Sequence, residues 1–131
     1  MNSKAKGEIS EAVIMAHLIK LGDIVLLPFG NNQRYDIVIE RNGNFIRGQC
    51  KTAHYRKGCL EFNVCSMNGF TGKTYDYKDQ IDVFWIYYPV NEKVYEISIN
   101  DVGISKVRLR LEPSKRYDKS SKIRWAKDYE I

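Results

Sequence analysis

Two oxygen-bearing side chains and one lysine are spaced so that a single hairpin would bring them together. Asp36 and Gln49 lie equally far from the Asn42-Gly43 dipeptide, and Lys51 follows Gln49 by two residues. Asn-Gly between two apolar-rich runs predicts a type I′ turn, because both residues tolerate positive φ. In that register Asp36 faces Gln49, and Lys51 projects from the same sheet face. The sequence therefore predicts that a carboxylate, an amide oxygen and an ammonium meet within residues 35–53.

A predicted helix over residues 3–21 would add another carboxylate to this group. Its expected buried stripe consists of apolar residues at helical spacing: Ala5, Ile9, Ala12, Val13, Ala16 and Ile19. Gly22 is a suitable residue to end the helix. Glu11 lies beside the stripe and is expected to face the sheet, with Glu8 three residues earlier on the helix surface. The helix dipole, which favours acidic residues in a first turn, is the alternative explanation for Glu8.

These residue types suit a hard divalent cation, which prefers oxygen ligands. The candidate ligands are the side chains of Glu11, Asp36 and Gln49 and the backbone carbonyl of Cys50, with Glu8 as a more distant candidate. Lys51 could orient a metal-bound water or stabilise charge that develops on a phosphoryl oxygen. The pattern thus predicts metal-dependent hydrolysis of a phosphodiester. The alternative is an ordinary cross-strand polar pair, with Lys51 protecting a sheet edge from aggregation.

The remaining elements predict an α/β (α+β) domain with a mixed central β-sheet flanked by helices. Further strands are expected at 24–27, 60–66, 82–88 and 93–99, a loop at 67–80, and a helical turn at 101–103. The run DVFWIYY at 82–88 is almost continuously apolar, which indicates a central strand covered on both faces. We expect a single domain, with a core at 1–104 and a basic extension at 105–131 packed on it.

Positive charge is concentrated at the end of the chain. The 131 residues carry a net charge of +5, and residues 105–131 alone hold nine Lys and Arg against four Asp and Glu. Such an excess indicates an anionic partner, most often nucleic acid, although solubility is the simpler explanation. The candidate DNA contacts are Arg34, Arg47, Arg56 and Lys57 near the hairpin, Lys73 and Tyr75 in the predicted loop, and Lys106, Arg108 and Arg110, which alternate with apolar residues in the extension.

The cysteines and histidines exclude two other classes of site. Cys50, Cys59 and Cys65 form no CxxC pair, and His17 and His54 are isolated, so neither a disulfide framework nor a zinc site is predicted. A reducing compartment, the bacterial cytosol or its equivalent, is expected. No apolar run approaches the length of a membrane span, and no signal peptide is predicted.

Three motifs, KGEISEA at 6–12, YDIVIE at 35–40 and GQCKTA at 48–53, resemble the PD-(D/E)XK nuclease superfamily. The likeness is greatest to the homing endonucleases of group I introns that use the restriction-endonuclease-like fold, and it covers residues 6 to about 89. It assigns the helix glutamate to Glu11, the motif aspartate to Asp36 and the (D/E)XK element to Gln49-Cys50-Lys51. Tyr35 replaces the motif proline, and Gln49 replaces the acidic residue, as in the active Q-x-K subgroup.

The resemblance implies a Mg²⁺-dependent enzyme, with Mn²⁺ as a possible substitute, that cuts both strands of double-stranded DNA at an intron insertion site. It also implies a symmetric homo-oligomer, a dimer or a tetramer, with the tetramer favoured. A Holliday-junction resolvase or a restriction- or repair-type nuclease of the same fold is the first alternative. The second is a non-catalytic nucleic-acid-binding module, in which Gln49 would mark the loss of catalysis.

Overall fold

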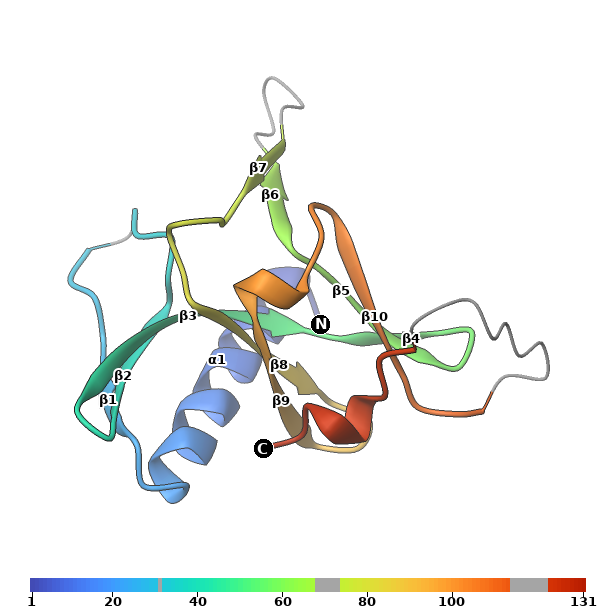
Figure 1. The fold of residues 1–131 in the computed structure, drawn as a ribbon, viewed down its shortest axis with the longest axis horizontal. Coiled ribbons are helices and arrows are strands. Elements are labelled where there is room, and N and C mark those ends of the chain that lie inside the picture. Colours follow the sequence, from blue (N-terminus) through green and yellow to red (C-terminus); the bar gives the residue numbers. More distant parts are fainter. Residues whose placement is uncertain (31, 68–73, 114–122) are drawn as a thin grey trace.

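A five-stranded mixed sheet forms the centre of the molecule (Figure 1). The computed structural model describes all residues except 31, 68–73 and 114–122. The sheet runs in the order β1 (Ile24–Leu26), β2 (Ile37–Arg41), β3 (Asn44–Thr52), β8 (Val83–Tyr88) and β9 (Lys93–Ser98). β3 and β8 are parallel, whereas the other neighbours are antiparallel. The predicted mixed central sheet is confirmed.

The hairpin of β2 and β3 has the predicted turn and register. Asn42 and Gly43 have φ values of 53° and 80°, as a type I′ turn requires. Five residue pairs follow, from Arg41 opposite Asn44 to Ile37 opposite Gly48. The ladder stops there, one pair before the position at which Asp36 would face Gln49. The predicted Asp36–Gln49 pair is therefore not part of the ladder.

The helix α1 (Ser3–Lys20) covers one face of the central sheet. The Asn2 side chain caps its start by accepting a hydrogen bond from the Ala5 N–H, and Gly22, at φ 96°, follows its end. Ile14 and Leu18 pack beneath the helix against Ile37, Ile39, Trp85 and other apolar residues of the sheet.

The predicted buried stripe of α1 is wrong for most of its members, although Val13 does pack against the cluster beneath the helix. The side chains that are buried against the sheet belong to Ser10, Ile14 and Leu18. Ile9 and Ile19 are 44% and 55% exposed, and Ala12 and Ala16 are also exposed. Apolar residues occur around most of this helix, so spacing alone does not define which side meets the sheet. Packing against β2, β3 and β8 selects the side.

A second sheet, not a second helix, covers the other face of the central sheet. It runs β10 (Lys106–Arg110), β5 (Cys59–Asn63), β4 (His54–Arg56), and its inner side chains join those of β8 and β9 in one core cluster. The predicted strand at 60–66 is divided between β5 and β6 (Cys65–Met67). β6 pairs with β7 (Thr74–Asp76) inside the predicted loop. α1 is the one α-helix among the described residues.

The last part of the chain is built into this arrangement. β10 pairs with β5 along five residues, and the Ile131 N–H donates to the Val94 carbonyl at 3.1 Å. A short 3₁₀ turn, η1 (Ile99–Asp101), begins two residues before the expected helical turn at 101–103 and overlaps it at Asp101, and a second 3₁₀ turn, η2 (Ala126–Asp128), follows Trp125. The division of the domain at residue 104 stays a prediction. None of the helices in the described ranges is long and apolar enough to cross a lipid bilayer.

Candidate active site

Asp36 occupies the point where β2 begins to pair with β3. Its N–H donates to the Gly48 carbonyl at 2.9 Å, so Asp36 is shifted from the position opposite Gln49. Its Oδ2 accepts the Cys50 N–H at 2.8 Å, which aims the carboxylate along β3. An irregularity at a strand end commonly redirects a side chain in this way. Asp36 thus lies next to the (D/E)XK segment through two backbone contacts.

Glu11 approaches Asp36 from α1. The two carboxylates line one cavity of about 280 Å³, together with residues of the segment 27–35. Burial raises the pKa of Glu11, and the nearby charges of Asp36 and then Glu8 raise it further. Burial also raises the pKa of Asp36, although the Cys50 N–H and the Lys51 ammonium act in the opposite direction. Two carboxylates that disfavour each other's charge form a site that a cation would stabilise.

Gln49 precedes Cys50, the residue whose N–H Asp36 accepts, and carries the third candidate oxygen ligand. Its Oε1 is buried and accepts no hydrogen bond from the described residues. A buried acceptor without a partner is costly, because it has lost water and gained nothing in return. A cation bound beside Asp36 and Glu11 would supply that partner. The described ranges contain no group of three His, Cys, Asp or Glu side chains that could hold a metal. The candidate side-chain ligands here are two carboxylates and one amide oxygen.

Lys51 follows on the same side of β3 and is half-buried. Its Nζ lies 5.2 Å from the ring centroid of Tyr77, and its charge lowers the pKa of Asp36. Cys50, between Gln49 and Lys51, packs in the cluster beneath α1, and burial raises the pKa of its thiol well above the ordinary value. The thiol of Cys50 is therefore kept neutral, and only its backbone is available to the site.

A contact between a buried and a half-buried hydroxyl fixes α1 relative to β3. Ser10 is 1% exposed, and its Oγ lies 2.5 Å from Oγ1 of Thr52. Since Ser10 precedes Glu11, this contact holds the turn of α1 that carries Glu11 against β3. Neither hydroxyl was predicted from the sequence. The spacing of Ser10, Ile14 and Leu18, four residues apart, was the signal that could have revealed the buried side of the helix.

The predicted DNA contacts are not gathered in one place: some are paired with other side chains, and others are exposed. Arg34 donates to Gln80 and lies over the Tyr77 ring, whereas Arg47 is paired with Asp82 by two side-chain hydrogen bonds of 3.2 Å. Arg56 and Lys57 are exposed at the turn between β4 and β5. Lys73 lies outside the described residues, and Tyr75 belongs to β7.

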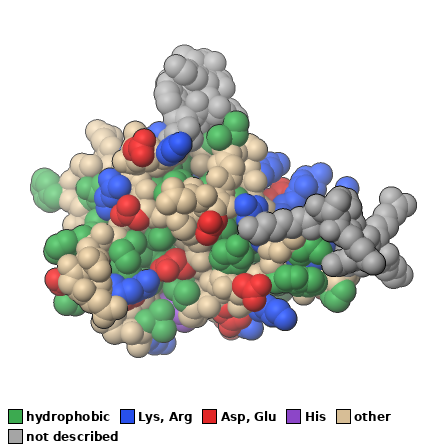
Figure 2. Space-filling model, viewed as in Figure 1, with side chains coloured by type: hydrophobic (Ala, Val, Ile, Leu, Met, Phe, Trp, Pro, Cys, Tyr) green, Lys and Arg blue, Asp and Glu red, His purple; other side chains and the backbone are tan. Residues whose placement is uncertain are grey.

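Lys106 and Arg108 both pair with a buried carboxylate on β5. The side chain of Glu61 is 1% exposed, and Arg108 donates to it at 2.8 Å, with Lys106 at 3.5 Å. The Arg108 hydrogen bond, more than any other contact, lowers the pKa of Glu61 to about 2. Arg110 instead donates to the Glu112 carbonyl. Lys and Arg side chains gather over this side of the molecule, with acidic side chains among them (Figure 2).

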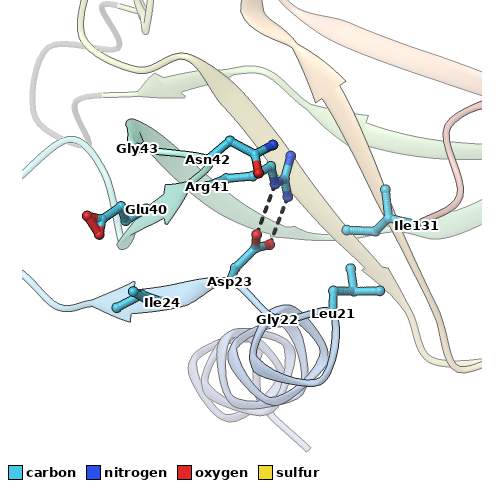
Figure 3. A pocket seen from close by; sticks show the side chains of 9 residues that line it. All are labelled: Leu21, Gly22, Asp23, Ile24, Glu40, Arg41, Asn42, Gly43 and Ile131. Carbon is cyan, nitrogen blue, oxygen red and sulfur yellow. Dashed lines mark hydrogen bonds and ion pairs between the residues drawn. The ribbon is translucent and has the colours of Figure 1, made fainter.

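A larger cavity of about 580 Å³ lies at the turn end of the hairpin, between the end of α1 and β2 (Figure 3). Arg41 spans it with two hydrogen bonds to Asp23 and two to Glu96, which also accepts from the indole of Trp85 at 2.7 Å. These bonds raise the pKa of Arg41 further, so the guanidinium stays charged. Every charged group in this network is paired with another, so we interpret it as a structural clamp and not as a reactive site.

Comparison with known proteins agrees with this geometry. The sequence matches the PD-(D/E)XK endonuclease family over residues 1–131. No curated protein matches the sequence. Among solved structures, the bacterial homing endonuclease I-Ssp6803I is similar, with a TM-score of 0.76 and 21% sequence identity over 99% of this chain and 89% of that one.

The chain belongs to the PD-(D/E)XK endonuclease family, since the match extends over its whole length. Membership defines it as a phosphodiester hydrolase whose substrate is DNA, and members of the family typically use divalent metals. The restriction-endonuclease-like fold expected from the three motifs is confirmed by the structural similarity.

Proposed function

We propose that this protein is a Mg²⁺-dependent endonuclease that cuts both strands of DNA at a specific site, as a homing endonuclease does. The observation that supports it most directly is the joining of Glu11 and Asp36 in one cavity. Asp36 also accepts the N–H of Cys50, and the preceding residue, Gln49, has a buried Oε1 without a hydrogen-bond partner among the described residues. Oxygen donors of this kind match Mg²⁺ or Mn²⁺, and the unpaired amide oxygen fits a bound cation better than an empty structural pocket.

Each residue has a distinct part in the proposed reaction. Glu11, Asp36, Gln49 and the Cys50 carbonyl would hold the cation, and Glu8 adds negative charge from one turn away. A divalent cation in such a site supplies Lewis-acid stabilisation and lowers the pKa of a bound water. Lys51 orients the attacking water or stabilises the negative charge of the phosphoryl oxygens as the leaving oxygen departs.

Arginine and lysine side chains near the site would hold the DNA backbone. The proposed contacts are Arg34, Arg47, Arg56, Lys57, Lys73, Tyr75, Lys106, Arg108 and Arg110. Phosphate contacts release counterions, so binding should weaken steeply as salt increases. One site per chain cuts one strand, and a homo-oligomer would supply the second site. The tetramer stays the favoured state by the resemblance of the motifs. Three unpaired cysteines support a reducing compartment such as the bacterial cytosol.

The decisive experiment is cleavage of DNA by purified protein with Mg²⁺, comparing a gene copy that carries the intron with one that lacks it. We expect one discrete cut in the intronless copy and none without the metal. Lys51→Ala should abolish cutting and leave DNA binding intact. Lys93→Ala is the matched control, because Lys93 is paired with Glu130 at the surface. Cleavage by Lys51→Ala at the wild-type rate would show that the assigned site is wrong.

Gln49→Glu tests the amide ligand separately. The added charge should tighten Mn²⁺ binding in calorimetry, because a carboxylate is a stronger ligand than an amide for a hard cation. Unchanged Mn²⁺ affinity would remove Gln49 from the metal site, whether or not the variant cleaves DNA.

Two other functions predict different products. A Holliday-junction resolvase would cut four-way junctions in preference to linear duplex of the same sequence. A non-catalytic binding module would bind DNA in a salt-dependent manner and give no product at any Mg²⁺ or Mn²⁺ concentration. A junction and a duplex with matched arms, incubated side by side, distinguish all three.

A further inference from the structure

Tyr77 lies in the core although it belongs to the connection between β7 and β8. It is 5% exposed, and its ring packs edge-on against Phe84, with centroids 5.6 Å apart and planes at 88°. Phe84 is the β8 partner of Gln49 in the parallel ladder. The ring of Tyr77 is therefore held by the sheet next to the candidate metal site. The loop predicted at 67–80 gives no indication of a buried ring at this position.

Two cations contact this one ring. Lys51 Nζ lies 5.2 Å from the ring centroid of Tyr77, and the guanidinium carbon of Arg34 lies 4.8 Å from it. Both distances are within the ~6 Å at which a cation is attracted by the ring quadrupole. Arg34 lies two residues before Asp36 and also donates its Nε–H to Gln80. The contact with Tyr77 thus links the segment that carries Asp36 to the strand that carries Lys51.

The kind of partner is as important as its position. No hydrogen bond or ion pair from the described residues holds the ammonium of Lys51. A carboxylate in that role would neutralise the charge that a phosphoryl oxygen needs. An aromatic ring restricts the ammonium without neutralising it, and because the ring is buried and Lys51 is half-buried, water weakens the attraction less than at an exposed site.

We infer that Tyr77 is a positioning residue, which holds Lys51 and Arg34 as a pair of cations directed at the phosphate that is cut. This inference rests on the proposed nuclease function. It adds Arg34 to the groups that contact the reacting phosphate, and it assigns a role in the reaction to a ring that would otherwise be an ordinary part of the core.

The test uses a supercoiled plasmid that carries a site cut by the wild-type protein, with Mg²⁺. Tyr77→Phe keeps the ring and should retain kcat within about twofold. Tyr77→Leu removes the ring and should lower kcat by about tenfold, which corresponds to ~1.4 kcal/mol, with little change in KM. Arg34→Met should lower kcat/KM by a similar factor. If Arg34→Met leaves kcat/KM unchanged, Arg34 does not contact the phosphate.

Phe62→Leu is the matched control for loss of core packing. Phe62 belongs to the same cluster, is 1% exposed, and lies 6.4 Å from Phe84 between ring centroids. Phe62→Leu should lower the midpoint of thermal unfolding about as much as Tyr77→Leu but keep kcat near the wild-type value. If both variants have the same kcat at a temperature where both are folded, Tyr77 has no positioning role.

A series of fluorinated phenylalanines at residue 77 tests the same point without changing the packing. Fluorine withdraws electron density from the ring face and weakens its attraction for cations. We expect kcat to fall stepwise from phenylalanine to the mono-, di- and trifluoro residues, and a constant kcat would overturn the inference. A wild-type protein that cuts no DNA would instead refute the nuclease proposal itself, so the two failures are distinguishable.

Discussion

Gly48→Ala should be among the most damaging single substitutions in the protein, because the chain at Gly48 lies directly against the ring of Trp85. A methyl group at this position would lie 2.0 Å from Cζ3 and 2.2 Å from Cε3 of the indole. Carbon atoms in contact normally lie ~3.5–4.0 Å apart. The indole cannot easily move away, because Trp85 is fully buried and its Nε1–H donates to Glu96 at 2.7 Å.

The size of the effect follows from this overlap. Overpacking a well-packed core costs ~1–3 kcal/mol and occasionally more. Because the indole cannot move away, we expect Gly48→Ala to lower the free energy of unfolding by ~3 kcal/mol or more. In a domain of this size, such a loss lowers the unfolding midpoint by about 10 °C. Gly48 also precedes Gln49 and accepts the Asp36 N–H, so a shift of the strand should weaken Mn²⁺ binding as well.

The assay is thermal unfolding followed by circular dichroism without metal, with Gly7→Ala as the control. Gly7 lies within α1 and has open space around it, so alanine there should stabilise the protein by ~1 kcal/mol through its helix propensity. The two glycine substitutions are therefore expected to have opposite signs. A midpoint for Gly48→Ala within about 2 °C of the wild-type value would refute the reasoning, because on the scale used here it corresponds to well under 1 kcal/mol.

Three further predictions concern charge. Glu11→Gln should raise the unfolding midpoint of the metal-free protein at pH 7, because it removes a carboxylate whose pKa is raised by burial and by the charge of Asp36. The same variant should no longer cleave DNA. An unfolding midpoint below that of the wild type would contradict the assignment. Glu61→Gln should destabilise the protein at pH 7. The depressed pKa of Glu61 contributes stability that is present above pH 4.5 and lost as the carboxylate is protonated, so the difference from the wild type should disappear as the pH falls from 4.5 towards 2. A difference in unfolding free energy that is independent of pH in urea titrations would disprove this. Arg41→Met should cost ~1–3 kcal/mol of unfolding free energy, because it leaves the largely buried carboxylate of Asp23 without its partner and removes one of the partners of Glu96. In chemical denaturation, Arg41→Lys should recover only part of that loss.

Several features of this protein follow from short-range pattern alone. The Asn42-Gly43 turn determines the register of the hairpin, because positive φ at both residues permits one tight connection and side chains alternate along each strand. The apolar run at 82–88 forms β8, because its alternate side chains are apolar on both faces and pack into the two core clusters. The motif residues on α1, β2 and β3 were sufficient to predict the family, which the comparison confirmed.

Other features depend on packing between elements that are distant in sequence. The burial of Glu61 could not be predicted, because its carboxylate is enclosed only when the side chains of Lys106 and Arg108 from β10 and of His54 from β4 close over it. The burial of Tyr77 could not be predicted either, because residue 77 lies in a predicted loop and its ring packs against Phe84 of β8. In both cases the local pattern was correctly observed, and the neighbours that decide burial lie elsewhere in the chain.

The sequence by itself determined which residues are available for the chemistry and how the hairpin that carries Asp36, Gln49 and Lys51 is paired. Only the tertiary structure decided how α1 is rotated, which places Ser10 against Thr52 and Glu11 beside Asp36. The physical reason is that a turn and a strand register depend on neighbouring dihedral angles. The rotation of a helix that is apolar on most sides depends on the shape of the sheet beneath it.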